Sequence, residues 1–209
     1  MKKIITLYGL LLIVFVQINA QQRTVAECTI NYTIAADSSD KTNINASLKG
    51  TTKTVYIKGN DTRTDVISPS FSQSVYYDKT SGNAVVLREF GNNKVMTKLS
   101  KSQWIEKNKK FEDATINIVG DTKIILGYEC KKAIIQNKDS STIIVYYATA
   151  ITPSVKEFEY QFKNIPGLVL EYDVQEGGKT IKYVATKINL NPVQVSKFDL
   201  PTSGYRLLN

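Results

Sequence analysis

Hydrophobic and polar residues alternate along most of the chain after residue 20. In residues 25–35, Cys28, Ile30 and Tyr32 fall on one side of an extended chain, and the polar residues between them fall on the other. A period of two over this length is typical of a strand with one buried face. Similar runs, separated by turn residues, cover residues 44–48, 52–58, 61–67, 71–78, 84–90, 94–99, 115–119, 123–126, 128–137, 142–151, 165–174 and 180–190.

Short turn sequences join these runs, which predicts sequential hairpins and an antiparallel sheet. Two examples are Gly120-Asp121 and the longer Glu176-Gly177-Gly178. So many strands cannot stay in one flat, open sheet. We therefore expect a mainly β fold, with a curved antiparallel sheet that forms a half-barrel and with at most one or two short helices. Residues 21–209 contain no repeat or linker and are expected to form a single domain.

Residues 100–110 are the best candidate for a helix. Ser100 followed by Gln103 fits a capping box, and Trp104 and Phe111 could pack against the sheet. A polar loop anchored by the two aromatic residues is the alternative. Residues 155–163 alternate imperfectly, with Phe158, Tyr160 and Phe162 on one face, and residues 193–205 look like an irregular tail that adds an edge strand.

The first twenty residues have a different pattern. Lys2 and Lys3 precede an apolar run, and the small residue Ala20 follows at an expected cleavage position. This arrangement is typical of a secretory signal peptide and is too short for a membrane span. We therefore expect residues 1–20 to be removed and the protein to be exported to the periplasm or the periphery of the outer membrane, with no transmembrane span after cleavage.

The most informative feature of the composition for function is a residue type that is absent. The sequence contains no histidine, so the usual general base and the commonest zinc and copper ligand are absent. We therefore expect no enzymatic activity, no catalytic residue, no metal and no cofactor. The formal net charge is +8. In an exported protein this charge favours a solvated surface over nucleic-acid binding.

Two cysteines, Cys28 and Cys130, occur in the chain. In an exported protein the default expectation is a disulfide, which would join the first strand to the segment at residues 124–133. Two buried free thiols are the alternative.

Other polar and aromatic patterns have simpler structural interpretations. Asp61, Arg63 and Asp65 share one strand face, which favours a charge ladder over a pair of catalytic carboxylates. The tyrosine pairs at residues 76–77 and 146–147 place their rings on opposite faces, so at most one ring of each pair could join a stacking platform.

A curved sheet with one apolar face creates a concave surface, and small-molecule sites are commonly concave and largely apolar. The candidate lining residues are Val145, Tyr147, Leu168, Leu170 and Tyr172. A closed, packed core would use the same residues, so the sequence leaves an open cavity and a packed interior as alternatives.

Two segments resemble the paired signatures of the GLPGLI family of exported Bacteroidetes proteins and a related domain of unknown function. They are Ile-Leu-Gly-Tyr-Glu-Cys-Lys-Lys-Ala at residues 125–133 and Ile-Pro-Gly-Leu-Val-Leu-Glu-Tyr at residues 165–172. Asn164-Ile165 replaces the Gly-Leu of the naming motif. The resemblance implies export and a fold like that of the lipoprotein carriers, a curled antiparallel sheet around an apolar concavity. It supplies no catalytic residue.

The expected function is therefore binding of an apolar ligand, such as a lipid or an acyl chain, in the concave sheet. The alternative is a structural or interaction protein of the cell envelope that docks a protein partner. An open apolar cavity would favour the first function, and a packed interior with an exposed apolar patch would favour the second.

Overall fold

A computed structural model of the chain describes residues 22–37, 48–176 and 179–208. In this part of the chain, one twelve-stranded sheet has the order β14-β7-β6-β5-β4-β3-β2-β13-β12-β10-β9-β8, and β1 and β11 form a separate pair. The strands are β1 (Arg23–Val25), β2 (Glu27–Asp37), β3 (Thr52–Lys58), β4 (Asp61–Ile67), β5 (Phe71–Asp78), β6 (Ala84–Phe90), β7 (Asn93–Leu99), β8 (Thr115–Ile125), β9 (Tyr128–Gln136), β10 (Thr142–Ala148), β11 (Ile151–Pro153), β12 (Leu168–Glu176), β13 (Lys179–Asn189) and β14 (Arg206–Leu208).

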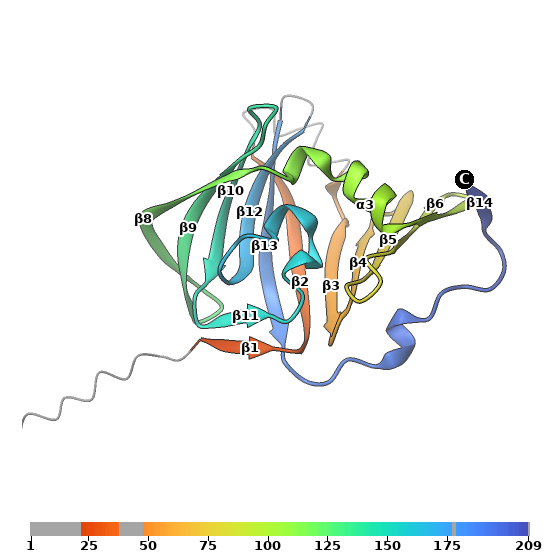
Figure 1. The fold of residues 1–209 in the computed structure, drawn as a ribbon, viewed down its shortest axis with the longest axis horizontal. Coiled ribbons are helices and arrows are strands. Elements are labelled where there is room, and N and C mark those ends of the chain that lie inside the picture. Colours follow the sequence, from red (N-terminus) through yellow and green to blue (C-terminus); the bar gives the residue numbers. More distant parts are fainter. Residues whose placement is uncertain (1–21, 38–47, 177–178, 209) are drawn as a thin grey trace, which may run out of the picture.

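The large sheet is antiparallel except at one edge, where β14 runs parallel to β7. Strands β2 to β7 follow one another as a meander, and β13 pairs with β2 to join this half to the half formed by β8, β9, β10 and β12. Figure 1 shows a strongly curved sheet that does not close. The predicted fold class, a mainly β half-barrel of antiparallel strands, is confirmed.

One face of the sheet, called the inner face here, packs against short helical segments. They are the α-helix α3 (Lys101–Lys107) and the 3-10 helices η2 (Lys156–Phe158) and η3 (Tyr160–Phe162). Two more 3-10 helices are η1 (Lys109–Phe111) and η4 (Val195–Phe198). Figure 1 shows α3 over strands β3–β6 and η2–η3 near the middle of the sheet.

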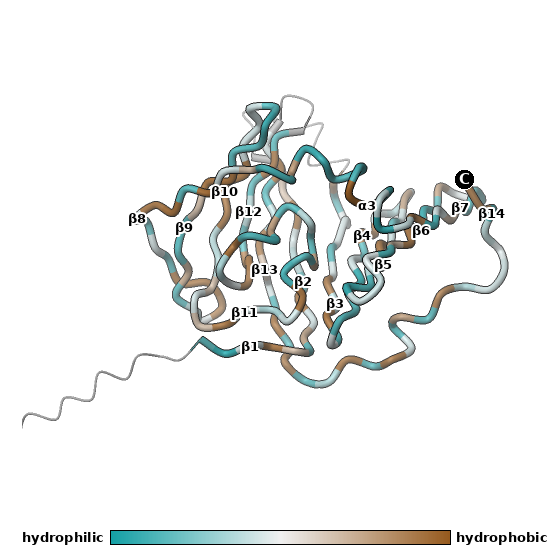
Figure 2. Tube along the Cα trace, viewed as in Figure 1, coloured by the Kyte–Doolittle hydropathy of each residue, from teal (hydrophilic) through white to brown (hydrophobic). Residues whose placement is uncertain are grey.

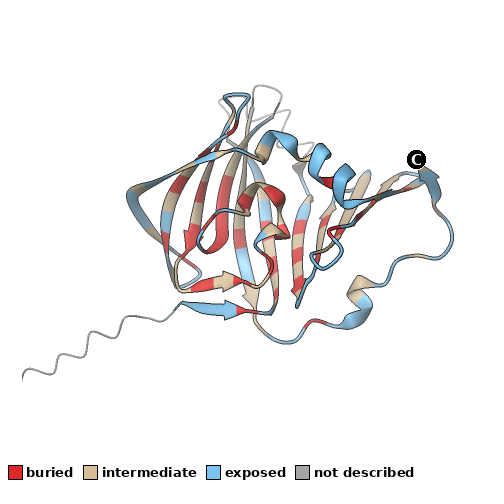
Figure 3. Ribbon diagram, in the orientation of Figure 1, coloured by how far each residue is buried: buried red, intermediate tan, exposed pale blue. Residues whose placement is uncertain are grey.

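The main hydrophobic core lies on the inner face between β2, β9, β10, β12 and the η2–η3 segment. Hydrophobic and polar positions alternate along these strands in Figure 2, and Figure 3 shows the buried positions concentrated there. Alternation therefore selects which face is buried, as the sequence predicts. Phe158 and Phe162 of the η2–η3 segment are buried in the same core and cover the sheet from above.

The predicted helix is confirmed at its N-terminal end. Ser100 is the N-cap of α3, its side chain accepts a hydrogen bond from the backbone of Gln103, and the Gln103 side chain accepts one from the Ser100 backbone. Trp104 is the buried residue of the helix. The capping box thus fixes where α3 begins, and this starting point places Trp104 on the side of the helix that faces the sheet.

Two local expectations are wrong. Gly120-Asp121 is not a hairpin turn, because β8 continues through it with a register shift between Val119 and Thr122. The chain reverses instead at Leu126 and Gly127, which both have positive φ, and paired positive φ angles give the turn that suits a tight hairpin. Residues 155–163 form η2 and η3 in place of a strand.

The expected Cys28–Cys130 disulfide is not formed in the structure: both cysteines are free and buried. Three strands separate β2 from β9 in the sheet. Both cysteines belong to the main hydrophobic core, so each thiol is surrounded by apolar side chains. The alternative of two buried thiols is the one observed, and burial raises the pKa of Cys28 to about 12 and that of Cys130 to about 11.

The C-terminal segment, residues 190–208, crosses the other face of β4–β7 and ends in β14 (Figure 1). Glu27 accepts a hydrogen bond from the Val193 backbone at 2.7 Å, and the Tyr205 hydroxyl donates a hydrogen bond to Glu89. An edge strand is present at residues 206–208, directly after the tail at residues 193–205 in which the sequence predicts it. Residues 1–20, the expected signal peptide, and most of the run at 44–48 lie outside the described residues.

Candidate functional site

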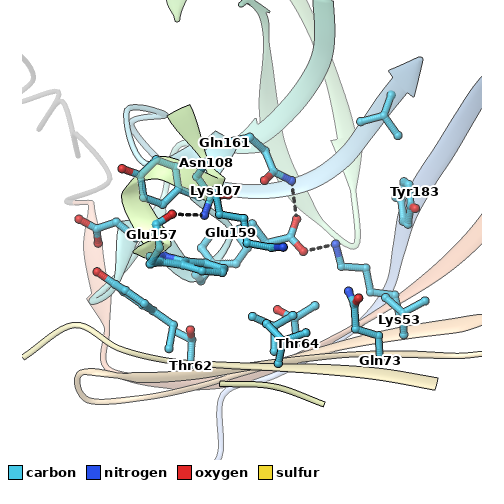
Figure 4. Close-up of a pocket in the computed structure, with 18 of the residues that line it drawn as sticks. Lys53, Thr62, Thr64, Gln73, Lys107, Asn108, Glu157, Glu159, Gln161 and Tyr183 are labelled. Carbon is cyan, nitrogen blue, oxygen red and sulfur yellow. Dashed lines mark hydrogen bonds and ion pairs between the residues drawn. The ribbon is translucent and has the colours of Figure 1, made fainter. Parts of the chain in front are cut away.

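A pocket of about 340 Å³ lies on the inner face beneath α3 and the η2–η3 segment. Its floor is formed by β3–β6, and its roof by the helical segments (Figure 4). The polar lining residues are Lys53, Thr62, Thr64, Gln73, Arg88, Lys107, Asn108, Glu157, Glu159 and Gln161, and the remaining lining residues are Val66, Val75, Tyr77, Val86, Trp104, Phe158, Tyr160, Tyr172, Val174 and Tyr183.

Strand register arranges the floor into cross-strand rows. One row, called the aromatic row, joins Thr62, Tyr77 and Ala84. Another, called the charged row, joins Lys53, Val66, Gln73 and Arg88. At about 3.3 Å per residue along a strand, the two rows are roughly 13 Å apart. Thr62 and Tyr77 line the pocket at one end of the floor, and Lys53, Gln73 and Arg88 line it at the other.

The charged row begins with a buried ion pair. Lys53 of β3 is paired with Glu159, which lies between η2 and η3, and the two side chains are only 5% and 8% exposed. Gln161 donates a hydrogen bond to the other carboxylate oxygen of Glu159 at 3.2 Å. The pair joins the roof of the pocket to its floor, as the dashed lines in Figure 4 show.

Aromatic rings surround the Lys53 ammonium. It lies 4.8 Å from the ring centroid of Tyr172 and 5.0 Å from that of Tyr183, and these two rings stack at 4.4 Å. Lys53 also donates a hydrogen bond to the Tyr172 hydroxyl. Burial lowers the pKa of Lys53, against the opposing effect of Glu159, and burial likewise raises the pKa of Tyr172. Because its charge is already matched within the protein, Lys53 is better suited to hold the roof than to bind a ligand.

The aromatic row lies against Trp104, the sole tryptophan of the chain. The Trp104 ring stacks on Tyr77 at 6.0 Å and meets Tyr160 edge-on at 6.3 Å. In the described structure, Trp104 Nε1 and Glu157 Oε2 are buried without a hydrogen-bond partner, and both residues line the pocket. Burial, followed by the Glu157 charge, raises the pKa of Tyr77, which places this carboxylate near the aromatic row.

The opposite end of the floor carries Arg88. Its Nε donates a hydrogen bond to Gln73 Oε1 at 2.8 Å, and Gln73 stands directly opposite it on β5. None of the ion pairs found in the described residues involves Arg88. The geometry therefore presents a partly buried guanidinium that is oriented by a neutral partner and directed to the pocket.

The five residues proposed from the sequence as a ligand surface are all buried, with exposures of 3% or less, and belong to the main core. Tyr172 is the one among them that lines the pocket. The rest of the core covers the other four residues, Val145, Tyr147, Leu168 and Leu170. Packing there is tight, because a Cβ added to Gly167 would lie only 2.7 Å from the Tyr147 ring. The part of the interior around these residues is thus packed, and the pocket lies beside it.

Sequence reasoning missed Lys53, Arg88 and the role of Trp104 in a pocket. A signal for Lys53 was present, because it has the same strand parity as Val55 and Ile57, which alternation places on the buried face. Arg88 shares the parity of Ala84 and Val86 in the same way. No local pattern indicates Glu159, since its pairing with Lys53 joins segments far apart in the sequence.

The charge ladder at β4 is present in part. Arg63 Nε lies 2.7 Å from Asp65 Oδ1, and Arg63 Nη1 donates a hydrogen bond to the Lys197 carbonyl of the C-terminal segment. The Asp61 carboxyl has a raised pKa through burial and, secondly, the nearby charge of Asp78. As predicted, the adjacent Tyr76 and Tyr77 point to opposite faces and join separate clusters.

In the described residues, no group of three or more His, Cys, Asp or Glu side chains could hold a metal ion. No helix in those same ranges is long and apolar enough to cross a membrane.

No known family profile matches the sequence, and no curated protein is significantly similar to it. Among solved structures, PNGF-II has a similar fold, with a TM-score of 0.52 and 14% identity over 87% of this chain, which spans 30% of the length of PNGF-II. An uncharacterized conserved protein from Thermus thermophilus also has a similar fold, with a TM-score of 0.50 and 8% identity, and the match covers 86% of this chain and 89% of the Thermus chain. At these identities the likeness concerns the fold alone.

Proposed function

We propose that this protein is a non-catalytic binding protein of the cell envelope that holds an amphipathic, lipid-like ligand in the pocket beneath α3. The observation that carries the proposal is the division of the pocket floor into an aromatic row and a charged row. Small-molecule sites typically combine apolar walls with a few convergent polar groups, in volumes of about 300–1,000 Å³. The pocket has this combination at the lower end of that range.

The side chains that line the pocket support an amphipathic ligand over the purely apolar ligand that the sequence predicts. A purely apolar molecule would leave the Nη groups of Arg88 without an acceptor from the ligand. An amphipathic ligand can place a polar group toward Gln73 and Arg88 and an apolar body against the rings of Trp104 and Tyr77. Export, supported by the signal-peptide pattern, would place the protein where such ligands occur.

Native mass spectrometry of the protein purified gently from its own cells tests the proposal. We expect a co-purifying mass that organic solvent removes. Thr64 lies on the pocket floor (Figure 4), so Thr64→Phe should reduce the bound fraction by filling the pocket. Thr33→Phe, at an exposed position of β2, is the matched control and should retain the ligand. Equal retention by both variants would refute the pocket as the binding site.

One observation favours a second function, docking of a protein partner at the edge strand β8. Ile118 and Ile124 of β8 are 56% and 68% exposed, and Leu126 beside them is 44% exposed. An exposed edge strand with apolar side chains is suited to accept a strand from another protein. A photo-crosslinking amino acid at position 124 should then capture a specific partner in the native host, and the same group at exposed Ile105 should not.

A further inference from the structure

We infer that the ligand carries an anionic head group, a carboxylate or a phosphate, which Arg88 binds through its terminal guanidinium nitrogens. The inference rests on the proposed function, because it names the chemistry of the ligand for the same pocket. It begins from a comparison of the arginines in the described residues: Arg23 and Arg206 are exposed, and Arg63 is paired with Asp65. Arg88 alone among them is partly buried with a neutral side-chain partner.

The orientation of Arg88 suits an incoming anion. Gln73 occupies Nε at 2.8 Å, which fixes the plane of the guanidinium and leaves its Nη groups for another acceptor. Guanidinium groups bind carboxylates and phosphates with paired hydrogen bonds, and a partly buried charge is stabilised when a counter-charge reaches it. Lys107, on the exposed surface of α3, adds a second positive charge at the pocket wall.

The acidic residues of the pocket do not compete for this position. Glu159 is engaged by Lys53 and Gln161. Glu157 acts on the pKa of Tyr77, in the aromatic row at the far end of the floor. An anionic head at Arg88 thus lies at the end of the pocket away from Glu157, and the apolar body of the same ligand extends toward Trp104.

Calorimetric titration of the full protein with three probes of the same chain length tests the inference: decanoate and decyl phosphate, each below its critical micelle concentration, and 1-decanol below its solubility limit. We expect at least one anion to bind about 10- to 100-fold more tightly than decanol, as a charge-assisted contact predicts. The anion that binds more tightly identifies a carboxylate or a phosphate as the natural head group.

The Arg88→Gln variant should lose this preference, and Arg88→Lys should lose part of it because lysine lacks the planar fork. Arg206→Gln is the matched control at an exposed site and should keep the full preference. An unchanged Trp104 emission maximum in the ligand-free variants would establish that they fold.

The outcomes separate the two proposals. Equal affinity for decanol and both anions would overturn the anionic head group and leave the pocket as a binding site. A preference that survives in Arg88→Gln would overturn the assignment of Arg88. Failure of all three probes to bind would overturn this inference and also count against the proposed function.

Discussion

Removing one member of the Lys53–Glu159 pair should strongly destabilise the protein. Both side chains are more than nine-tenths buried, so Lys53→Met leaves the buried Glu159 carboxylate without its counter-charge. Breaking a buried pair in this way typically costs about 3–5 kcal/mol. For a domain of this size, that loss corresponds to a decrease in melting temperature of roughly 6–20 °C.

The double variant Lys53→Met/Glu159→Leu should recover most of this stability, because apolar replacement of a whole buried pair is often neutral or stabilising. Urea unfolding followed by Trp104 fluorescence and by circular dichroism measures each free energy of unfolding. The control is Lys109→Met, which breaks a helix-surface pair whose side chains are 71% and 70% exposed and should change stability by less than about 0.5 kcal/mol. A loss below about 1 kcal/mol for Lys53→Met would refute the reasoning, since it would mean that the pair is solvated.

Three further predictions concern other parts of the fold. Burial raises the pKa of Cys28 to about 12 and that of Cys130 to about 11, so both thiols should resist a thiol reagent at pH 8 in the native protein. Both should react once the protein is unfolded in denaturant without reductant. No reaction in denaturant would indicate a disulfide. The main cause that lowers the pKa of Glu27 is the hydrogen bond from the Val193 backbone, and for Glu89 it is the hydrogen bond from the Tyr205 hydroxyl. The stability that these two carboxylates contribute to the fold is therefore present above pH 4.5 and is lost as the pH falls through their lowered folded-state pKa values. Hydrogen exchange should therefore show residues 193–208 loosening in acid before β10 and β12, and simultaneous exchange would contradict this. Gly167→Ala would place a Cβ 2.2 Å from the Ala148 carbonyl oxygen and should destabilise the fold by about 1–3 kcal/mol in urea unfolding, whereas an unaffected midpoint would mean that the backbone there can move.

The pattern of alternation was sufficient to predict most of the sheet. Each strand with one buried face repeats its apolar residues every second position, so β2 and β3 could be placed with their inward residues identified. The capping residues Ser100 and Gln103 similarly located α3, because the interaction is local.

The predictions that were wrong concerned features that depend on backbone geometry or on contacts between residues far apart in the sequence. Gly120-Asp121 has turn composition, but the extra residues are absorbed as an irregularity within β8, and the reversal occurs at Leu126-Gly127. The expectation of a disulfide rested on the cellular compartment and the number of cysteines, whereas the three strands between β2 and β9 decide that the two sulfurs do not meet.

The candidate site was the least predictable part for the same reason. The apolar character of their strands indicated Val145 and Leu170 as ligand-lining residues, yet both side chains are fully buried among their neighbours in the core. The pocket arises where α3 and the η2–η3 segment stand over β3–β6, and it is lined in part by Lys53 and Arg88, which local sequence patterns assign to strands without showing what covers them.

A fluorescence titration tests the central claim most directly, because the sole tryptophan of the chain, Trp104, lines the pocket. Decanoate added to the wild-type protein should produce a saturable change in emission intensity or wavelength, and Thr64→Phe should weaken that change by occupying the floor. A saturable signal that depends on Thr64 would support a ligand site beneath α3. An emission spectrum unaffected by every amphiphile, in a protein that also carries no native ligand, would contradict the account.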